Sequence, residues 1–131
     1  MHTSEGSLRY STNDGKYKLI VEVDPSITSY YMSLVPKFYH LKMQRYAPHI
    51  SVIRNEIPAT LSNWGKHEGE VVQFDYEGDI KNDEIYFWLP VYSRRLNDIR
   101  IELGLNMTSQ FSRPPDGSDC FHTTMGNIKS L

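Results

Sequence analysis

The sequence has very little cysteine and no long apolar segment. Cys120 is the single cysteine among 131 residues, so an intramolecular disulfide is excluded. A chain without disulfides is typical of reducing compartments. No apolar run approaches the roughly 18–20 residues that cross a bilayer, and residues 1–15 lack the apolar core of a secretory signal. We therefore expect a soluble protein of the cytoplasm.

A large excess of charge of one sign is also absent. The chain has 14 Lys and Arg residues against 16 Asp and Glu residues, a formal net charge of −2. Proteins that bind long nucleic acid or anionic membranes through their overall charge are strongly basic. The balance therefore excludes both kinds of bulk electrostatic binding, and any nucleotide ligand has to be held at a local site.

Motifs for metal or cofactor binding are missing as well. The sequence contains neither a Cys-x-x-Cys pair nor a His-Glu-x-x-His motif. Without such ligand spacing we expect no metal site and no cofactor. A nucleophilic cysteine needs a neighbouring base, so we interpret the lone Cys120 as a bystander.

What the chain does contain is enough apolar material for one packed domain. Hydrophobic residues make up 39% of the sequence and aromatic residues 12%. Residues 1–15 are rich in Ser, Thr, Asn and Gly and end in Asn13-Asp14-Gly15, which predicts a flexible leader closed by a turn. We expect residues 16–131 to form a single domain.

The order of the predicted elements indicates an α+β fold. Asp24-Pro25 is a typical helix start, and Pro36 interrupts the helical pattern that follows. Ser93 and Gly104 fit the two ends of a second helix. Two similar strand–helix–strand halves with mainly antiparallel sheets are therefore expected. Hydrophobic patterning predicts strands at 17–23, 49–53, 71–76, 85–89 and 120–128, and a loop at 106–119.

Two short motifs of the form His-x-Ser/Thr fall in two of these strands. The first is His49-Ile50-Ser51 and the second is His122-Thr123-Thr124. Side chains alternate between the faces of a strand, so each strand presents one imidazole and one hydroxyl on the same face. We expect the two strands to deliver these groups to a common surface.

Two imidazoles and two hydroxyls suit the cleavage of a phosphodiester. In-line displacement needs a base for the attacking oxygen and an acid for the departing one, and imidazole, with an unperturbed pKa near ~6.5, serves either role near neutral pH. The hydroxyls hydrogen-bond the non-bridging oxygens as negative charge develops. The pattern leaves open which imidazole is the base.

On these residues the chain resembles the 2H phosphoesterase superfamily. The first motif lies in the run APHISV and the second in FHTTMGN. The resemblance implies a bilobal fold with two pseudo-symmetric β-α-β halves around a central cleft, and metal-independent phosphodiesterase activity. It also implies a catalytic set of His49, Ser51, His122 and Thr124.

The compact chain and Tyr17 at the start of a strand look most like the anti-CBASS branch of this superfamily. Phages encode that branch, and it degrades cyclic oligonucleotide immune signals. The resemblance therefore implies a cyclic oligonucleotide substrate and a location in the host cytoplasm.

Other aromatic and basic residues are candidates for substrate binding. Tyr17 and Trp64 could stack on a base, and Lys18 could supply charge to a phosphate. Arg54 follows the first motif but has the opposite parity from His49, so regular strand alternation predicts that it points away from the site.

Three alternatives remain beside the cyclic oligonucleotide phosphodiesterase. One is an enzyme that acts on RNA ends or 2′,3′-cyclic phosphates. A second is a nucleotide-binding sponge that retains the cleft without turnover. The third is a small interaction module in which the histidines have no chemical role.

Overall fold

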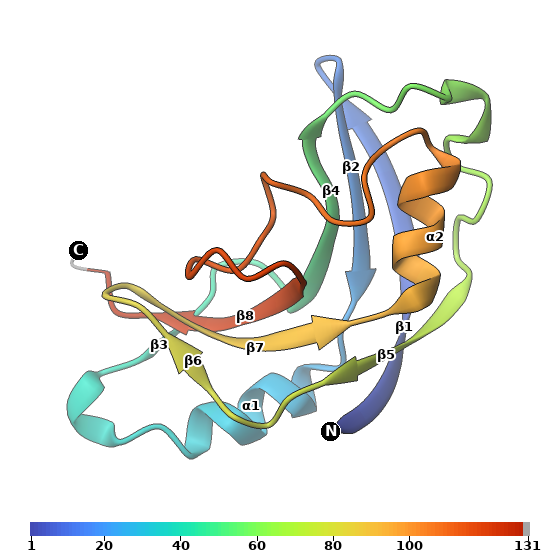
Figure 1. Cartoon of the computed structure of the whole chain (residues 1–131). Helices are drawn as coiled ribbons and strands as arrows, with labels where there is room; N and C mark the ends of the chain where they lie inside the picture. Colours follow the sequence, from blue (N-terminus) through green and yellow to red (C-terminus); the bar gives the residue numbers. More distant parts are fainter. Residues whose placement is uncertain (130–131) are drawn as a thin grey trace.

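The computed structural model describes residues 1–129, which form an antiparallel sheet of eight strands and two α-helices (Figure 1). The general prediction of an α+β fold is confirmed. The strands are β1 (His2–Asn13), β2 (Lys16–Glu22), β3 (Lys42–Met43), β4 (His49–Glu56), β5 (Val71–Tyr76), β6 (Lys81–Asn82), β7 (Tyr86–Tyr92) and β8 (Phe121–Asn127). The helices are α1 (Pro25–Ser33) and α2 (Arg94–Glu102), with 3₁₀ turns η1 (Lys37–Tyr39) and η2 (Leu61–Asn63).

The sheet closes on itself through β8. The strand order is β3-β8-β4-β2-β1-β5-β7-β6, and β8 also pairs with β7. Strands β4, β2, β1, β5, β7 and β8 therefore form a continuous hydrogen-bonded circuit. Ile50 and Thr123 are the single registered pair between β4 and β8, and the two strands diverge from this junction (Figure 1).

The prediction of a flexible leader at residues 1–15 is wrong. This segment forms β1, which pairs with β5 along its first half and with β2 along its second half. Its polar composition is misleading because most of its side chains face solvent, whereas Leu8 is fully buried. Gly6 is required in β1, since a Cβ there would lie 1.9 Å from the Glu22 carbonyl oxygen.

The predicted turn and helix ends are confirmed. Asp14 and Gly15 both have positive φ, 52° and 72°, as a tight turn between β1 and β2 requires. The Asp24 carboxylate caps α1 by accepting a hydrogen bond of 2.9 Å from the Ser26 amide. Pro36 separates α1 from η1, and Ser93 caps α2.

Strand β4 contains a β-bulge directly after the first motif. Leu19 of β2 pairs with Ile53, but the next residue, Ile20, pairs with Ser51, so Val52 has no partner in β2. Val52 and Ile53 are consecutive, yet both are fully buried. A bulge of this kind shifts the alternation of side chains by one residue. Arg54 therefore faces the same side of β4 as Ser51.

The two helices bury separate hydrophobic clusters. One cluster combines residues of β1, β2, β4 and β5 with Leu96, Ile99 and Leu103 at α2. The other combines Tyr31 of α1 with residues of β7 and β8. None of the helices formed by residues 1–129 has the length and hydropathy that crossing a bilayer demands.

Candidate functional site

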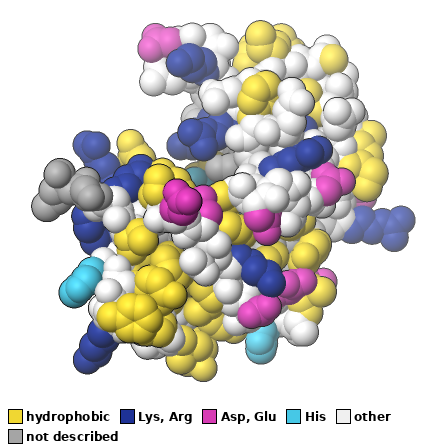
Figure 2. All heavy atoms as spheres, turned by 60° about the vertical axis from the view of Figure 1, so that its left-hand side comes forward, with side chains coloured by type: hydrophobic (Ala, Val, Ile, Leu, Met, Phe, Trp, Pro, Cys, Tyr) yellow, Lys and Arg dark blue, Asp and Glu magenta, His cyan; other side chains and the backbone are white. Residues whose placement is uncertain are grey.

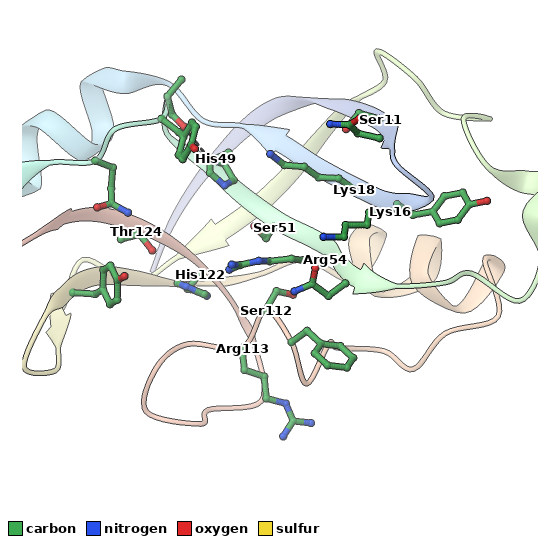
Figure 3. A pocket seen from close by; sticks show the side chains of 18 of the residues that line it. Ser11, Lys16, Lys18, His49, Ser51, Arg54, Ser112, Arg113, His122 and Thr124 are labelled. Atoms are coloured by element: carbon green, nitrogen blue, oxygen red, sulfur yellow. Dashed lines mark hydrogen bonds between the residues drawn. The ribbon is translucent and has the colours of Figure 1, made fainter.

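A cleft of about 910 Å³ lies where β4 and β8 meet. Both histidines and both outer hydroxyl residues of the two motifs line it, namely His49, Ser51, His122 and Thr124. Figure 3 shows these side chains on the two neighbouring strands, with the chain that precedes β8 forming the opposite wall. The prediction that the two motifs share one surface is confirmed.

The β4–β8 junction brings the two motifs together. Ile50 pairs with Thr123, so Ser51 and His122 follow this pair on one side, and His49 and Thr124 follow it on the other. The strands diverge from the pair, and the four side chains line the cleft between them. His49 also contributes to the lowered pKa of His122, so the two imidazoles lie near each other in this cleft.

The opposite faces of β4 and β8 explain why these side chains point into the cleft. Ile50 is fully buried, and Thr123 and Met125 are almost completely buried. Moving either strand by one residue would expose this apolar face and bury the motif side chains instead. Core packing therefore fixes which face carries the imidazoles and hydroxyls.

His49 is oriented by the backbone just before its strand. Its Nδ1 lies 2.9 Å from the carbonyl oxygen of Ala47. A carbonyl only accepts hydrogen bonds, so Nδ1 is the donor. This bond leaves Nε2 of His49 as the nitrogen available to a ligand in the cleft.

The side chain of His122 is largely buried. Its pKa is lowered to about 4, mainly by burial; the nearby His49 and Arg54 also lower it, whereas the Ser112 backbone and Asp116 raise it. Its Nδ1 is buried and has no partner with hydrogen-bonding geometry among the described residues. At neutral pH the His122 imidazole is therefore uncharged, as a proton acceptor has to be.

Arg54 lines the cleft, which corrects the prediction that it points away. Regular alternation would place it opposite to His49, but the bulge at Val52 reverses the alternation. Its guanidinium extends toward His122 in Figure 3, and its charge contributes to the lowered pKa of His122. Sequence periodicity does not reveal a bulge, so strand parity alone missed this residue.

Tyr17 and Trp64 have different positions. Tyr17 is among the residues that line the cleft, and its ring also packs against the hydrophobic cluster beneath α2. Trp64 is not among the lining residues, and its ring packs edge-on against Tyr17 and Tyr10 at centroid distances of 5.0 and 4.9 Å. The prediction that Trp64 contacts a ligand directly is therefore not supported by its position, because it lies behind Tyr17 and supports that ring.

The cleft is positively charged although the chain as a whole is weakly acidic. Among its described lining residues, Asp14 is the one acidic side chain, against five basic ones. Figure 2 shows Lys and Arg side chains around a hollow on the face that it presents. The basic residues are Lys16, Lys18, Arg54, Arg113 and Lys129.

These basic residues come from segments that are distant in the sequence. Lys16 and Lys18 lie on β2 near its turn with β1, and Arg113 lies in the loop at 106–119 (Figure 3). Lys18 was a candidate from the sequence, whereas Lys16 and Arg113 were missed. No local pattern distinguishes them from ordinary surface residues, because only the closure of the sheet brings them together.

Other candidate groups lie outside this site. Cys120 does not line the cleft, and burial raises the pKa of its thiol, which disfavours a nucleophilic role. Within residues 1–129, no three His, Cys, Asp or Glu side chains lie close enough together to hold a metal ion. No family model matches the chain, and neither does any curated protein or solved structure.

Proposed function

We propose that the protein is a phosphodiesterase of the 2H type, with the two helix-covered clusters as its two halves. The observation that carries the proposal is the β4–β8 junction, which brings the imidazoles and hydroxyls of both motifs into one cleft. A pure binding site has no need of two matched acid and base groups. Paired imidazoles in one cleft suit proton transfer at both ends of an in-line displacement.

In the proposed reaction, His122 acts as the base and His49 as the acid. His122 takes the proton of the attacking hydroxyl, whose oxygen forms a bond to phosphorus. The bond from phosphorus to the leaving oxygen breaks as His49 gives its Nε2 proton to that oxygen, which requires His49 to begin the step with a proton on both ring nitrogens. The lowered pKa of His122 supports this assignment, because the base must be uncharged at the start.

The hydroxyls and Arg54 stabilise the charge that develops on the phosphate. Ser51 and Thr124 donate hydrogen bonds to the non-bridging oxygens, and Arg54 adds an ionised donor beside them. Where the first step leaves a cyclic phosphate, its hydrolysis reverses the roles. His49 then takes a proton from water, and His122 returns its proton to the leaving oxygen.

We further propose that the substrate is a cyclic oligonucleotide. The cleft of about 910 Å³ is at the upper end of the range of roughly 300–1,000 Å³ that is usual for small-molecule sites. Its basic residues are spread from the β1–β2 turn to the loop at 106–119, so they suit a ligand with more than one phosphate. Tyr17 offers a surface for a base.

A metal-free cleavage assay tests this function. The protein is incubated in EDTA with cyclic dinucleotides, cyclic trinucleotides and 2′,3′-cyclic mononucleotides, and the products are separated by chromatography. We expect cleavage of a cyclic oligonucleotide. Cleavage of the 2′,3′-cyclic mononucleotides alone would favour the RNA-end enzyme, and tight retention of unchanged ligand would favour the sponge.

Single-histidine variants sharpen the assay. His49→Ala and His122→Ala should each reduce kcat by about 10²–10⁴-fold, the usual contribution of a general acid or base. His40→Asn is the matched control, because His40 is exposed, lies outside the cleft and has a positive φ that Asn tolerates. Equal activity of all three variants would refute the catalytic role of the two motifs.

A further inference from the structure

A fully buried arginine stands behind the cleft. Arg100 of α2 has no exposed surface, and its Nη1 and Nη2 donate hydrogen bonds of 2.9 and 2.8 Å to the two carboxylate oxygens of Glu56. Burial alone would raise the pKa of the Glu56 carboxyl, but the bonds from Arg100 and Ser109 hold it below its usual value. The pair is therefore a permanent ion pair inside the fold.

The remaining hydrogen bonds of Arg100 go to two particular backbone carbonyls. Nη1 donates to Val52 at 2.8 Å, and Nε donates to Asn106, also at 2.8 Å. Val52 is the extra residue of the β4 bulge and has no partner in β2. Asn106 begins the loop at 106–119. One guanidinium thus ties together α2, the bulge and the start of this loop.

Stabilisation of the fold is by itself a weak explanation for the buried Arg100–Glu56 ion pair. Taking two charges out of water costs several kcal/mol, and well-packed apolar residues often stabilise a fold as well as a buried ion pair does. Specific geometry is what a planar guanidinium with fixed donor directions provides. Arg100 fixes the geometry of two segments that flank His122, namely the bulge of β4 and the start of the loop at 106–119.

Both segments contribute side chains to the cleft. The bulge turns Arg54 into the cleft, since without the extra residue its side chain would point to the opposite face. The loop at 106–119 supplies Phe111, Ser112 and Arg113 to the opposite wall. Arg100 is therefore hydrogen-bonded to the bulge and to the loop, and the positions of these two segments determine where Arg54 and the opposite wall lie.

We propose that the Arg100–Glu56 pair is a positioning device, which locks the bulge of β4 so that Arg54 points at the phosphate beside His122. The inference builds on the proposed function, because it assigns Arg54 a phosphate to bind. Arg100 acts on ligand binding only through Arg54, and it does not touch the ligand. Its effect on binding should therefore disappear when Arg54 is absent.

A double-mutant cycle between Arg100→Lys and Arg54→Ala tests this coupling. A lysine keeps the charge, but its single ammonium cannot reach Glu56, Val52 and Asn106 in the directions of the guanidinium. The probe is inorganic phosphate, whose affinity is measured by following backbone amide signals in NMR titrations. This readout does not require turnover, so it remains decisive if no diester is cleaved and the proposed function fails.

The expected result is a strongly non-additive cycle. Arg54→Ala should weaken phosphate binding about tenfold or more, the usual effect of losing a hydrogen bond from a charged group. Arg100→Lys should weaken it to a similar extent, and the double variant should bind no more weakly than the single variants, within about twofold. Where a diester is cleaved, both single variants should lower kcat/KM to a similar extent.

Arg95→Lys is the matched control. Arg95 lies on the same helix and makes the same two-bonded ion pair with Glu70, at 2.8 and 2.9 Å, but away from the cleft. The Arg95→Lys variant should bind phosphate with the same affinity as the native protein. Near-UV circular dichroism verifies folding of each variant, and Glu56→Gln replaces Arg100→Lys in the cycle if the latter does not fold.

Three outcomes would overturn the inference. In the first, the losses from Arg54→Ala and Arg100→Lys multiply, so Arg100 acts independently of Arg54. In the second, Arg95→Lys weakens binding as much as Arg100→Lys, which indicates a general effect on stability. In the third, the native protein does not bind phosphate at all.

Discussion

Ile50 of β4 pairs with Thr123 of β8, and this one pair joins two segments that are far apart in the chain. Both side chains face the core, so the residues on either side of them face the cleft. The junction therefore determines the distance between the two His-x-Ser/Thr motifs.

Removing either hydroxyl should slow the reaction more than it weakens binding. We expect Ser51→Ala and Thr124→Ala to lower kcat by about 10–1,000-fold with a smaller change in KM, because their hydrogen bonds strengthen as charge builds up on the phosphate. Steady-state kinetics on the cleaved diester measures both constants. Ser29→Ala, an exposed hydroxyl on α1 outside the cleft, is the control. A rise in KM at constant kcat would contradict the proposed role.

The lowered pKa of His122 predicts how folding stability depends on pH. The folded protein protonates His122 only near pH 4, whereas an unfolded chain protonates it near 6.5. Between these values the unfolded chain binds more protons, so stability is lost as the pH falls through this window and is fully present above it. Between pH 8 and pH 5 the loss due to His122 should be about 2 kcal/mol.

Urea unfolding at a series of pH values measures this effect. His122→Asn removes the titrating group, so its free energy of unfolding should change less over the same range. The control is again His40→Asn, which should follow the native protein. An identical pH dependence in the native protein and in His122→Asn would show that His122 is not held uncharged by burial.

The same pKa predicts the pH dependence of catalysis. A base must be unprotonated, and a group with a pKa of about 4 is largely unprotonated at pH 5. We therefore expect kcat/KM to show no acidic limb between pH 7 and pH 5. A base with an ordinary histidine pKa near ~6.5 would lose almost tenfold in rate for each pH unit below that value. Such a limb would contradict the assignment of His122 as the base.

Binding of the ligand should be sensitive to salt through the basic lining of the cleft. Lys18→Ala should weaken binding about 3- to 10-fold at low salt, and the slope of log Kd against log salt should decrease by about one phosphate contact. Lys37→Ala, at an exposed position of η1 outside the cleft, is the control. A salt slope that is the same in Lys18→Ala and the native protein would exclude a phosphate contact by Lys18.

Tyr17 and Trp64 should affect different properties. Loss of a stacking platform costs about 1–3 kcal/mol per base, so Tyr17→Ala should raise the Kd for an oligonucleotide roughly 5- to 150-fold, while Tyr17→Phe binds normally. Trp64→Phe should lower Tm with a smaller effect on Kd, because Trp64 packs behind Tyr17. The reverse pattern would show that Trp64 is the platform.

Local patterns in the sequence were sufficient to predict the motif strands and their orientation. Alternation placed His49 and Ser51 on one face because Ile50 has to be buried, and the helix starts at Asp24 and Ser93 depend only on nearby residues. The same local logic failed for Arg54. The partners of a bulge lie elsewhere in the fold, and here Arg100 hydrogen-bonds to the extra residue, Val52. No periodic pattern in the sequence marks the position of such a bulge.

The failure at residues 1–15 has a related cause. A strand paired on both sides through its backbone needs few apolar side chains when one face is open to solvent. Leu8 alone was too weak a signal against the polar residues around it. The basic lining of the cleft was equally hidden, since Lys16 and Arg113 meet only after the sheet closes.

The most direct test of the central claim is whether both imidazoles contact one phosphorus-like centre. Orthovanadate, which mimics a phosphoryl group in transfer, is titrated in a metal-free buffer without EDTA, which would bind the vanadate, into protein labelled with ¹⁵N at histidine. We predict that the ring signals of His49 and His122 shift together and saturate at one equivalent, while those of His40 do not move. A shift of one ring alone, or of neither, would contradict the account.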